Sequence, residues 1–190
     1  MSVEIDALDQ EPTRPLLREE YDALVEAGFL EDEPVELIEG RLVIMSPEGA
    51  PHSAAITSIG HTLALALGER AWVRTGHPFA ASNVSEPEPD VCVVRPGDYW
   101  KDHPQSALLV IEVAFSSIRK DRMVKPRVYA AAGVPEYWIV DLNSDTVTIL
   151  RDPTPVGYAT AQDRARGQSI GLLAFPDVVL DVDSFLPPPT

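Results

Sequence analysis

Glu112 is the residue whose position most needs a chemical explanation. It lies inside LLVIEVAF, residues 108–115, a segment that is otherwise apolar and rich in strand-forming residues. Strand alternation puts Glu112 on one face with Val110, and Ile111 on the other. A carboxylate inside a strand covered on both faces is costly unless it is paired or binds a cation. We therefore predict that a partner meets Glu112; a structural pair with a neighbouring Arg is the simplest alternative to a catalytic role.

Asp90 is the second acid in an unusual place. It stands between Pro89 and the apolar segment VCVV, residues 91–94. Asp is common where strands begin, so Asp90 alone carries little weight. The pair of Asp90 and Glu112 is stronger evidence for a functional site. Two acids on neighbouring strands can share a hard divalent cation such as Mg²⁺, which prefers oxygen ligands.

Lys125 lies on the helix predicted after this strand. Asp121, Lys125 and Tyr129 are spaced by four residues and share one helix face. A lysine beside a metal site could orient or deprotonate water, or neutralise charge on a phosphate, whereas an ordinary surface ion pair is the structural alternative. Pro126 is tolerated if the helix begins near residue 122 or 123, so that the proline falls in its first turn; a helix that began at residue 117 would have to kink.

The charge distribution bears on possible partners. The chain has 30 Asp and Glu against 15 Lys and Arg, a net charge of −15. Residues 1–40 hold 13 of the acids and only two bases. Five bases instead cluster within nine positions, where they could meet a polyanion locally, although a solvated helix face is the alternative. We predict nucleic-acid binding by the members of this cluster that flank Lys125: Arg119, Lys120, Arg122 and Arg127.

Composition excludes several classes of protein. With 45% hydrophobic residues the chain can form a core, and apolar runs of about four or five residues are too short for a transmembrane helix. The first residues show no secretory signal, and the single Cys92 cannot form an internal disulfide. We expect a cytoplasmic protein, with no membrane association, made of a flexible acidic leader (1–15) and one domain (16–190).

Periodicity and turn residues outline the fold. The element order predicts an α/β, or mixed α+β, protein with a central mixed β-sheet flanked by helices. The expected elements are helices at 18–28, 52–67 and 122–132, a hairpin at 35–45, and strands at 71–81, 91–94, 108–115, 136–142 and 146–150. Beyond residue 150 we expect a polar loop and two weak strands near 170 and 180.

Three segments together resemble a known family. They are PEPDVCVV (87–94), LLVIEVAFSS (108–117) and the stretch 121–141, which reads D-x-x-x-K-x-x-x-Y-A-x-x-G-V-P-E-Y-W-I-V-D. With ELIEGRLVIMSPEGAPH (36–52), they are similar to the Uma-two family of putative restriction endonucleases, part of the PD-(D/E)XK nuclease superfamily. The resemblance covers residues 21–150, and GVPEYWIVD is its most specific part.

The resemblance implies a restriction-endonuclease-like fold and a set of functional residues. Asp90 and Glu112 would bind Mg²⁺ or Mn²⁺, and an activated water would attack a phosphodiester of nucleic acid, with DNA as the first choice. The superfamily lysine normally follows the acid by two residues, but Ala114 stands there, so Lys125 would replace it from the helix. Supporting positions near the site would be Glu39, His52, Asp121 and Tyr129. The family also suggests a homodimer.

Two alternatives stay open at this point. The chain could be a catalytically inactive nuclease-fold protein that serves as a binding or regulatory module. It could also keep the metal site and act on RNA or on a small phosphodiester.

Overall fold

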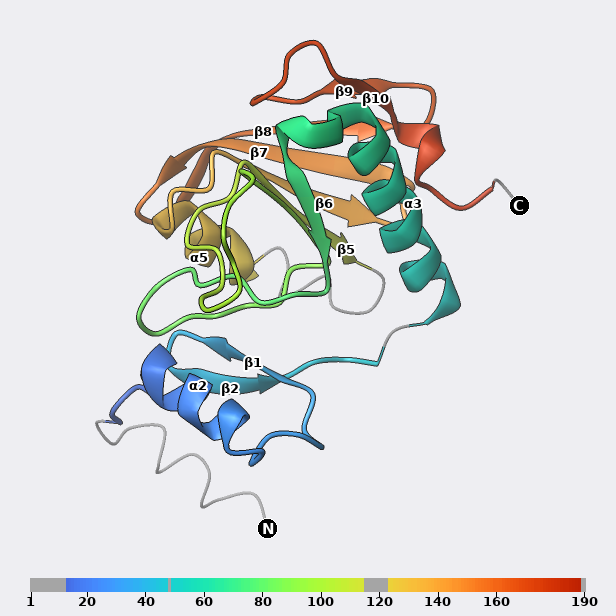
Figure 1. The fold of residues 1–190 in the computed structure, drawn as a ribbon. Coiled ribbons are helices and arrows are strands. Elements are labelled where there is room, and N and C mark those ends of the chain that lie inside the picture. Colours follow the sequence, from blue (N-terminus) through green and yellow to red (C-terminus); the bar gives the residue numbers. More distant parts are fainter. Residues whose placement is uncertain (1–12, 48, 115–122, 189–190) are drawn as a thin grey trace.

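The centre of the molecule is a six-stranded mixed sheet (Figure 1). The computed structural model describes residues 13–47, 49–114 and 123–188. Strand order across the sheet is β3-β4-β5-β6-β7-β8. The β5–β6 pair is parallel and the other neighbouring pairs are antiparallel. The strands are β3 (Trp72–Thr75), β4 (Val91–Val94), β5 (Leu109–Ala114), β6 (Glu136–Asp141), β7 (Thr146–Thr154) and β8 (Gly157–Ala165).

Two helices cover opposite faces of this sheet (Figure 1). On one face, Leu63 of α3 (Ala50–Leu67) packs in a core that includes Ile111. On the other face, Tyr129 of α5 (Lys125–Ala131) packs in a second core with Val110 and Cys92. Strand β5 therefore sends alternate side chains into the two cores, as its sequence predicts. A mixed sheet flanked by helices is thereby confirmed as the architecture.

The start of α5 decides how Lys125 is held. The helix begins at Lys125, and Pro126 occupies its first turn. A proline is tolerated there because the first N–H groups of a helix have no acceptor within the helix. Pro126 therefore costs α5 no internal hydrogen bond. Residues 115–122 lie outside the described residues, so the two predicted cases, a helix start near residue 122 or 123 and a kinked helix from residue 117, both stay predictions.

A smaller N-terminal unit lies below the sheet in the view of Figure 1. It contains α2 (Arg18–Glu26) and an antiparallel hairpin of β1 (Val35–Ile38) and β2 (Arg41–Ile44). The predicted turn at Glu39 and Gly40 is confirmed, and both residues have positive φ, 49° and 75°. A Cβ at Gly40 would overlap Pro15, so this position requires glycine for space as well as for conformation. Backbone hydrogen bonds between Leu37 and Glu86 join the hairpin to the segment that leads into β4.

The sequence analysis made one strand too long and missed another. The strand expected over 71–81 ends at Thr75, because Gly76 has a positive φ of 60° and Pro78 lacks a backbone donor. The region after residue 150 was expected to be a polar loop, but β7 extends to Thr154 and pairs with β8. Strand β8 is mostly exposed and polar, so it lacks the apolar alternation on which the prediction relied.

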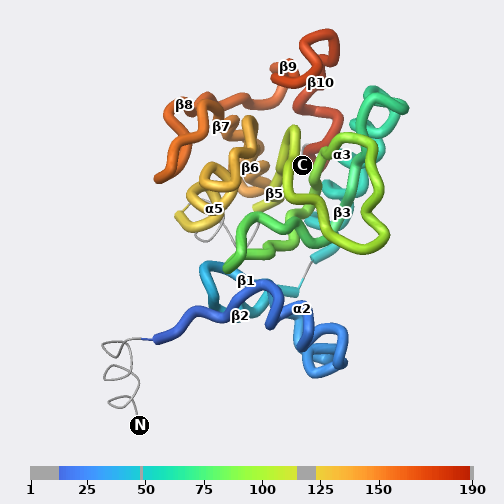
Figure 2. The backbone as a smooth tube through the Cα atoms, turned by 60° about the vertical axis from the view of Figure 1, so that its left-hand side comes forward, coloured from blue at the N-terminus to red at the C-terminus, as the bar shows by residue number. Residues whose placement is uncertain are grey.

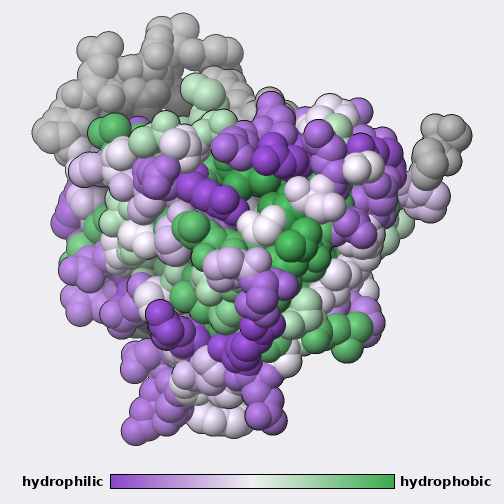
Figure 3. Space-filling model, turned by 90° about the horizontal axis from the view of Figure 1, so that it is seen from above, coloured by the Kyte–Doolittle hydropathy of each residue, from purple (hydrophilic) through white to green (hydrophobic). Residues whose placement is uncertain are grey.

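The C-terminal segment closes one end of the α3-side core. The two weak strands are confirmed as an antiparallel pair, β9 (Ser169–Gly171) and β10 (Val179–Asp181). Figure 2 shows β9 and β10 at the end of the molecule opposite α2. On the face of the molecule seen in Figure 3, apolar residues are bordered by polar ones. Short 3₁₀ turns, η1 (Gly68–Arg70) and η2 (Val182–Ser184), complete the elements. Among the described residues, no helix is long and apolar enough to cross a membrane.

Candidate active site

Glu112 lies at the centre of a buried polar cluster. Its residue is 3% exposed, in the middle of β5. Its Oε1 atom accepts a hydrogen bond from Lys125 Nζ at 2.8 Å and another from the Tyr129 hydroxyl at 2.6 Å. Both donors come from α5, one turn apart, so the helix face predicted from their spacing is confirmed for these two residues. Among the described residues, the partners of Glu112 therefore include a lysine and a tyrosine.

Lys125 lies between two carboxylates. Its side chain is 5% exposed, and its Nζ atom is 3.7 Å from Oε2 of Glu36 in addition to its bond with Glu112. Glu36 comes from β1, is fully buried, and accepts the backbone N–H of Glu88 at 3.2 Å. The N-terminal hairpin thus contributes an acid to the cluster. Two carboxylates around one ammonium group hold the lysine in position.

The sequence analysis did not single out Glu36 as a site residue. Its signal is nevertheless of the same kind as that of Glu112, because it is an acid inside the apolar segment VELI, residues 35–38. The sequence alone does not show that Glu36 contacts Lys125, which lies 89 positions away. This contact depends on how the hairpin docks against the sheet.

Asp90 joins the cluster from the neighbouring strand. Its Oδ2 atom accepts the backbone N–H of Val113 at 2.6 Å and lies 3.3 Å from His52 Nε2 of α3. The β4–β5 register pairs Val91 with Ile111, and one further step of that register places Asp90 opposite Glu112. Side chains directly opposite each other have Cβ atoms about 5 Å apart. The fold therefore brings together two of the predicted acids and the predicted supporting His52.

Tyr129 remains a hydrogen-bond donor over the whole working pH range. Burial and the adjacent Glu112 carboxylate raise the pKa of Tyr129 well above 10. Its ring packs against Tyr137 and Phe79, with ring centres 5.1 and 6.2 Å away. A protonated, tightly packed tyrosine fixes the orientation of the Glu112 carboxylate.

Glu88 borders this cluster on the side of the hairpin. Burial raises the pKa of Glu88, the charge of Glu36 raises it further, and the charge of Lys125 opposes the rise. Three acids, Glu36, Glu88 and Glu112, therefore interact with one lysine.

Glu39 and Arg127 form a pair at the surface. The Glu39 carboxylate accepts two hydrogen bonds from the Arg127 guanidinium, at 3.0 and 2.7 Å, and both side chains are about half exposed. The predicted supporting Glu39 thus contacts a predicted nucleic-acid-binding residue. The other predicted residues of that segment, Arg119, Lys120, Asp121 and Arg122, lie outside the described residues.

A comparison with protein families shows which family this chain belongs to. Residues 18–183 match the family model Uma2, whose description is "Putative restriction endonuclease". The chain belongs to the Uma2 family. A comparison with curated proteins finds no match.

A solved structure supports the Uma2 fold. The crystal structure of a putative nuclease belonging to DUF820 from Anabaena variabilis ATCC 29413 superposes with a TM-score of 0.66. The two sequences are 16% identical, and the match covers 83% of this chain and 94% of that one. The predicted restriction-endonuclease-like fold of this Uma2 protein is thereby confirmed.

The donor atoms of this Uma2 site suit a hard divalent cation. Asp90 and Glu112 offer carboxylate oxygens at adjacent strands, and the side-chain contacts of Asp90 to described residues use Oδ2. Within residues 13–47, 49–114 and 123–188, no group of three or more His, Cys, Asp or Glu side chains is arranged to hold a metal. Mg²⁺ keeps several waters and binds through only one or two carboxylates, so a two-acid site fits it and the similar Mn²⁺.

Proposed function

We propose that this Uma2 protein is a metal-dependent endonuclease that hydrolyses phosphodiester bonds in nucleic acid, with DNA as its substrate. The observation that carries the proposal is the shared contact of Lys125 and Tyr129 with one oxygen of buried Glu112, opposite Asp90. A purely structural ion pair would not need a second acid on the adjacent strand. Membership of the Uma2 family, whose description is "Putative restriction endonuclease", supports this reaction class.

Asp90 and Glu112 would hold Mg²⁺ or Mn²⁺. When bound, such a cation supplies Lewis-acid activation of water and of the scissile phosphate. The protein's own contribution is to fix the acids. The Val113 N–H holds Asp90, and Tyr129 holds Glu112 from the side of α5.

Lys125 provides the positive charge of the site. Its ammonium group would stabilise negative charge that develops on the phosphate during hydrolysis, and it would orient the attacking water. Since Lys125 comes from a helix start rather than from β5, its position depends on Pro126 and on Glu36. Ala114, the residue two positions after Glu112, has no side chain capable of this role.

The remaining parts of the proposal concern partners and location. Arg127, with the basic residues 119, 120 and 122, would contact the phosphate backbone. We further propose that the protein acts as a homodimer in the cytoplasm. The net charge of −15 opposes strong non-specific DNA binding, so the substrate would have to be held by this local basic segment.

A cleavage assay tests the proposal. Wild-type protein would be incubated with supercoiled plasmid, linear duplex, single-stranded DNA, RNA and bis(p-nitrophenyl) phosphate, with Mn²⁺ or Mg²⁺. We expect metal-dependent cleavage of DNA that is lost in Glu112→Gln and in Lys125→Met. Glu69→Gln is the matched control, because Glu69 is an exposed acid of η1 outside the cluster.

Each result has a definite meaning. Loss of activity in Glu112→Gln alone would remove Lys125 from the mechanism. Cleavage of RNA or of the small ester but not of DNA would change the substrate. If no substrate is cleaved, and calorimetry shows no Mn²⁺ binding that Asp90→Asn or Glu112→Gln weakens, the protein is a non-catalytic binding module.

A further inference from the structure

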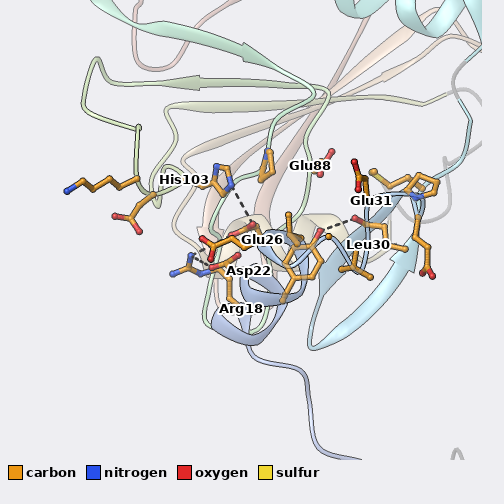
Figure 4. Close-up of a pocket in the computed structure, with 18 residues that line it drawn as sticks. Arg18, Asp22, Glu26, Leu30, Glu31, Glu88 and His103 are labelled. Atoms are coloured by element: carbon orange, nitrogen blue, oxygen red, sulfur yellow. Dashed lines mark hydrogen bonds and ion pairs between the residues drawn. The ribbon is translucent and has the colours of Figure 1, made fainter.

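A cavity lies beside the candidate active site, and Glu88 borders both. The cavity has a volume of about 690 Å³ and lies between α2, the start of β1, and the segments that carry Glu86 and His103. Figure 4 shows Arg18 and Asp22 on α2 with His103 facing them from another segment, and Glu88 and Glu31 toward the hairpin. Cavities of about 300 to 1,000 Å³ are the usual size of small-molecule sites.

The lining of this cavity is strongly acidic. Seven Asp and Glu side chains line it, against two bases, Arg18 and Lys101. A phosphate or another anion would be repelled from such a surface, whereas a cation would be concentrated there. The cavity is therefore unsuited to the nucleic-acid backbone.

One carboxylate oxygen in the lining has no hydrogen-bond donor among the described residues. Glu86 is 2% exposed, and its buried Oε2 atom accepts no hydrogen bond from this part of the chain. Its ion pairs are longer than hydrogen bonds: Arg18 Nη1 is 3.6 Å from Oε2, and His103 Nε2 is 3.9 Å from Oε1. The backbone N–H of Glu86 is bonded to Leu37, so the residue cannot easily turn away. Buried carboxylate oxygens almost always have a donor, and a ligand with an N–H group would supply it.

The apolar part of the lining restricts the ligand further. Val25, Leu30, Val35 and Met45 contribute hydrocarbon surface between the acids. A chain of methylene groups could lie against these side chains while charged ends reach carboxylates. A bare metal ion would leave that surface unused.

We propose that this cavity binds an aliphatic polyamine, with one ammonium group donating to Glu86. The other ammonium groups lie among the remaining acids, including Glu88 and Glu31. Glu86 selects for an N–H donor, and the apolar wall selects for the hydrocarbon chain.

The location of the cavity gives this site a consequence for the enzyme. Glu88 lines the cavity and also interacts electrostatically with Glu36 and Lys125. A bound polyamine therefore adds positive charge beside the candidate active site and reduces its repulsion of a phosphate. This consequence rests on the proposed nuclease function, whereas polyamine binding itself does not.

Calorimetric titration with spermidine at low ionic strength and pH 8 tests the site. We expect saturable binding to the wild-type protein that weakens at least five-fold in Glu86→Gln. Glu69→Gln removes the same charge outside the cavity and should stay within two-fold of wild type. Thermal unfolding of each variant confirms that it is folded, and neither measurement requires nuclease activity.

Two results would overturn the proposal. Equal affinity of spermidine for wild type, Glu86→Gln and Glu69→Gln would mean attraction by net charge without a site. An absence of spermidine binding, with or without binding of an Arg-rich peptide, would show that the cavity does not take a small amine. Mg²⁺ titrated alone provides the comparison for a ligand without a hydrocarbon chain, and Mg²⁺ binding as sensitive to Glu86→Gln as spermidine binding would contradict the role of the apolar wall.

Discussion

Lys125 Nζ lies 2.8 Å from Glu112 Oε1 and 3.7 Å from Glu36 Oε2, and all three side chains are buried. One ammonium group from the start of a helix thus neutralises acids from two sheets that are far apart in sequence. The arrangement ties the N-terminal hairpin to the candidate active site, so stability and activity should depend on the same contacts.

Removal of Lys125 should destabilise the fold. Lys125→Met leaves Glu112 and Glu36 buried without their cation, and breaking a buried pair in this way costs about 3 to 5 kcal/mol. Adding Glu112→Gln should restore part of the loss, because the unpaired charge is removed. Urea unfolding of the single and double variants measures both effects. Lys101→Met, at an exposed lysine, is the control, and an equal loss there would contradict the buried-pair account.

The hydroxyl of Tyr129 should contribute more than an ordinary tyrosine hydroxyl. Tyr129→Phe removes a hydrogen bond to a charged acceptor, worth about 1.5 to 3 kcal/mol. Tyr158→Phe is a matched control, because its hydroxyl donates to the neutral carbonyl of Val134 at 2.9 Å and should cost about 1 kcal/mol. Thermal unfolding compares the two. If Tyr158→Phe loses as much stability as Tyr129→Phe, the hydrogen bond to Glu112 contributes no more than one to a neutral carbonyl.

Glu86 should make stability fall as pH rises. Burial and the nearby Asp22 carboxylate raise the pKa of Glu86 from 4.5 to about 7. Between these two values the unfolded chain has released the proton while the folded protein still holds it. Raising the pH through that window therefore favours unfolding, by up to about 3 kcal/mol above pH 7.

The variant Glu86→Gln isolates this effect. It should gain stability relative to wild type at pH 8 and gain nothing at pH 4.5, as measured by denaturant unfolding at both values. Glu69→Gln, on the exposed surface, should show no such difference between the two pH values. A constant offset for Glu86→Gln across the pH range would contradict a raised pKa.

The surface pair of Arg127 and Glu39 should affect nucleic-acid binding rather than stability. Both side chains are about half exposed, and exposed pairs contribute about 0 to 1 kcal/mol. If Arg127 contacts a phosphate, Arg127→Ala weakens duplex binding and lowers the salt dependence, the slope of log K against log salt, by about 0.9. Glu39→Ala frees the guanidinium and should strengthen binding. Fluorescence anisotropy at several salt concentrations measures both, and opposite signs are the decisive outcome.

The sequence by itself determined most of the apolar strands and the residues that did not fit them. Glu112 stands out because a buried strand tolerates a carboxylate only with a partner, and the spacing of Lys125 and Tyr129 places both on one helix face. The position of Pro126 was compatible with a helix start near residue 122 or 123 or with a kinked helix from residue 117, and in the structure α5 begins at Lys125 with Pro126 in its first turn. These inferences use contacts within one element, which local rules describe well.

Only the tertiary structure decided which elements meet. Asp90 lies next to Glu112 because β4 and β5 pair antiparallel and Asp90 accepts the N–H of Val113. Glu36 reaches Lys125 because the hairpin is bonded to the segment around Glu86. The polar strand β8 and the acidic cavity around Glu86 also escaped sequence analysis. Strand pairing and the docking of the hairpin depend on backbone hydrogen bonds between distant segments, and these leave little mark on the local order of apolar and polar residues.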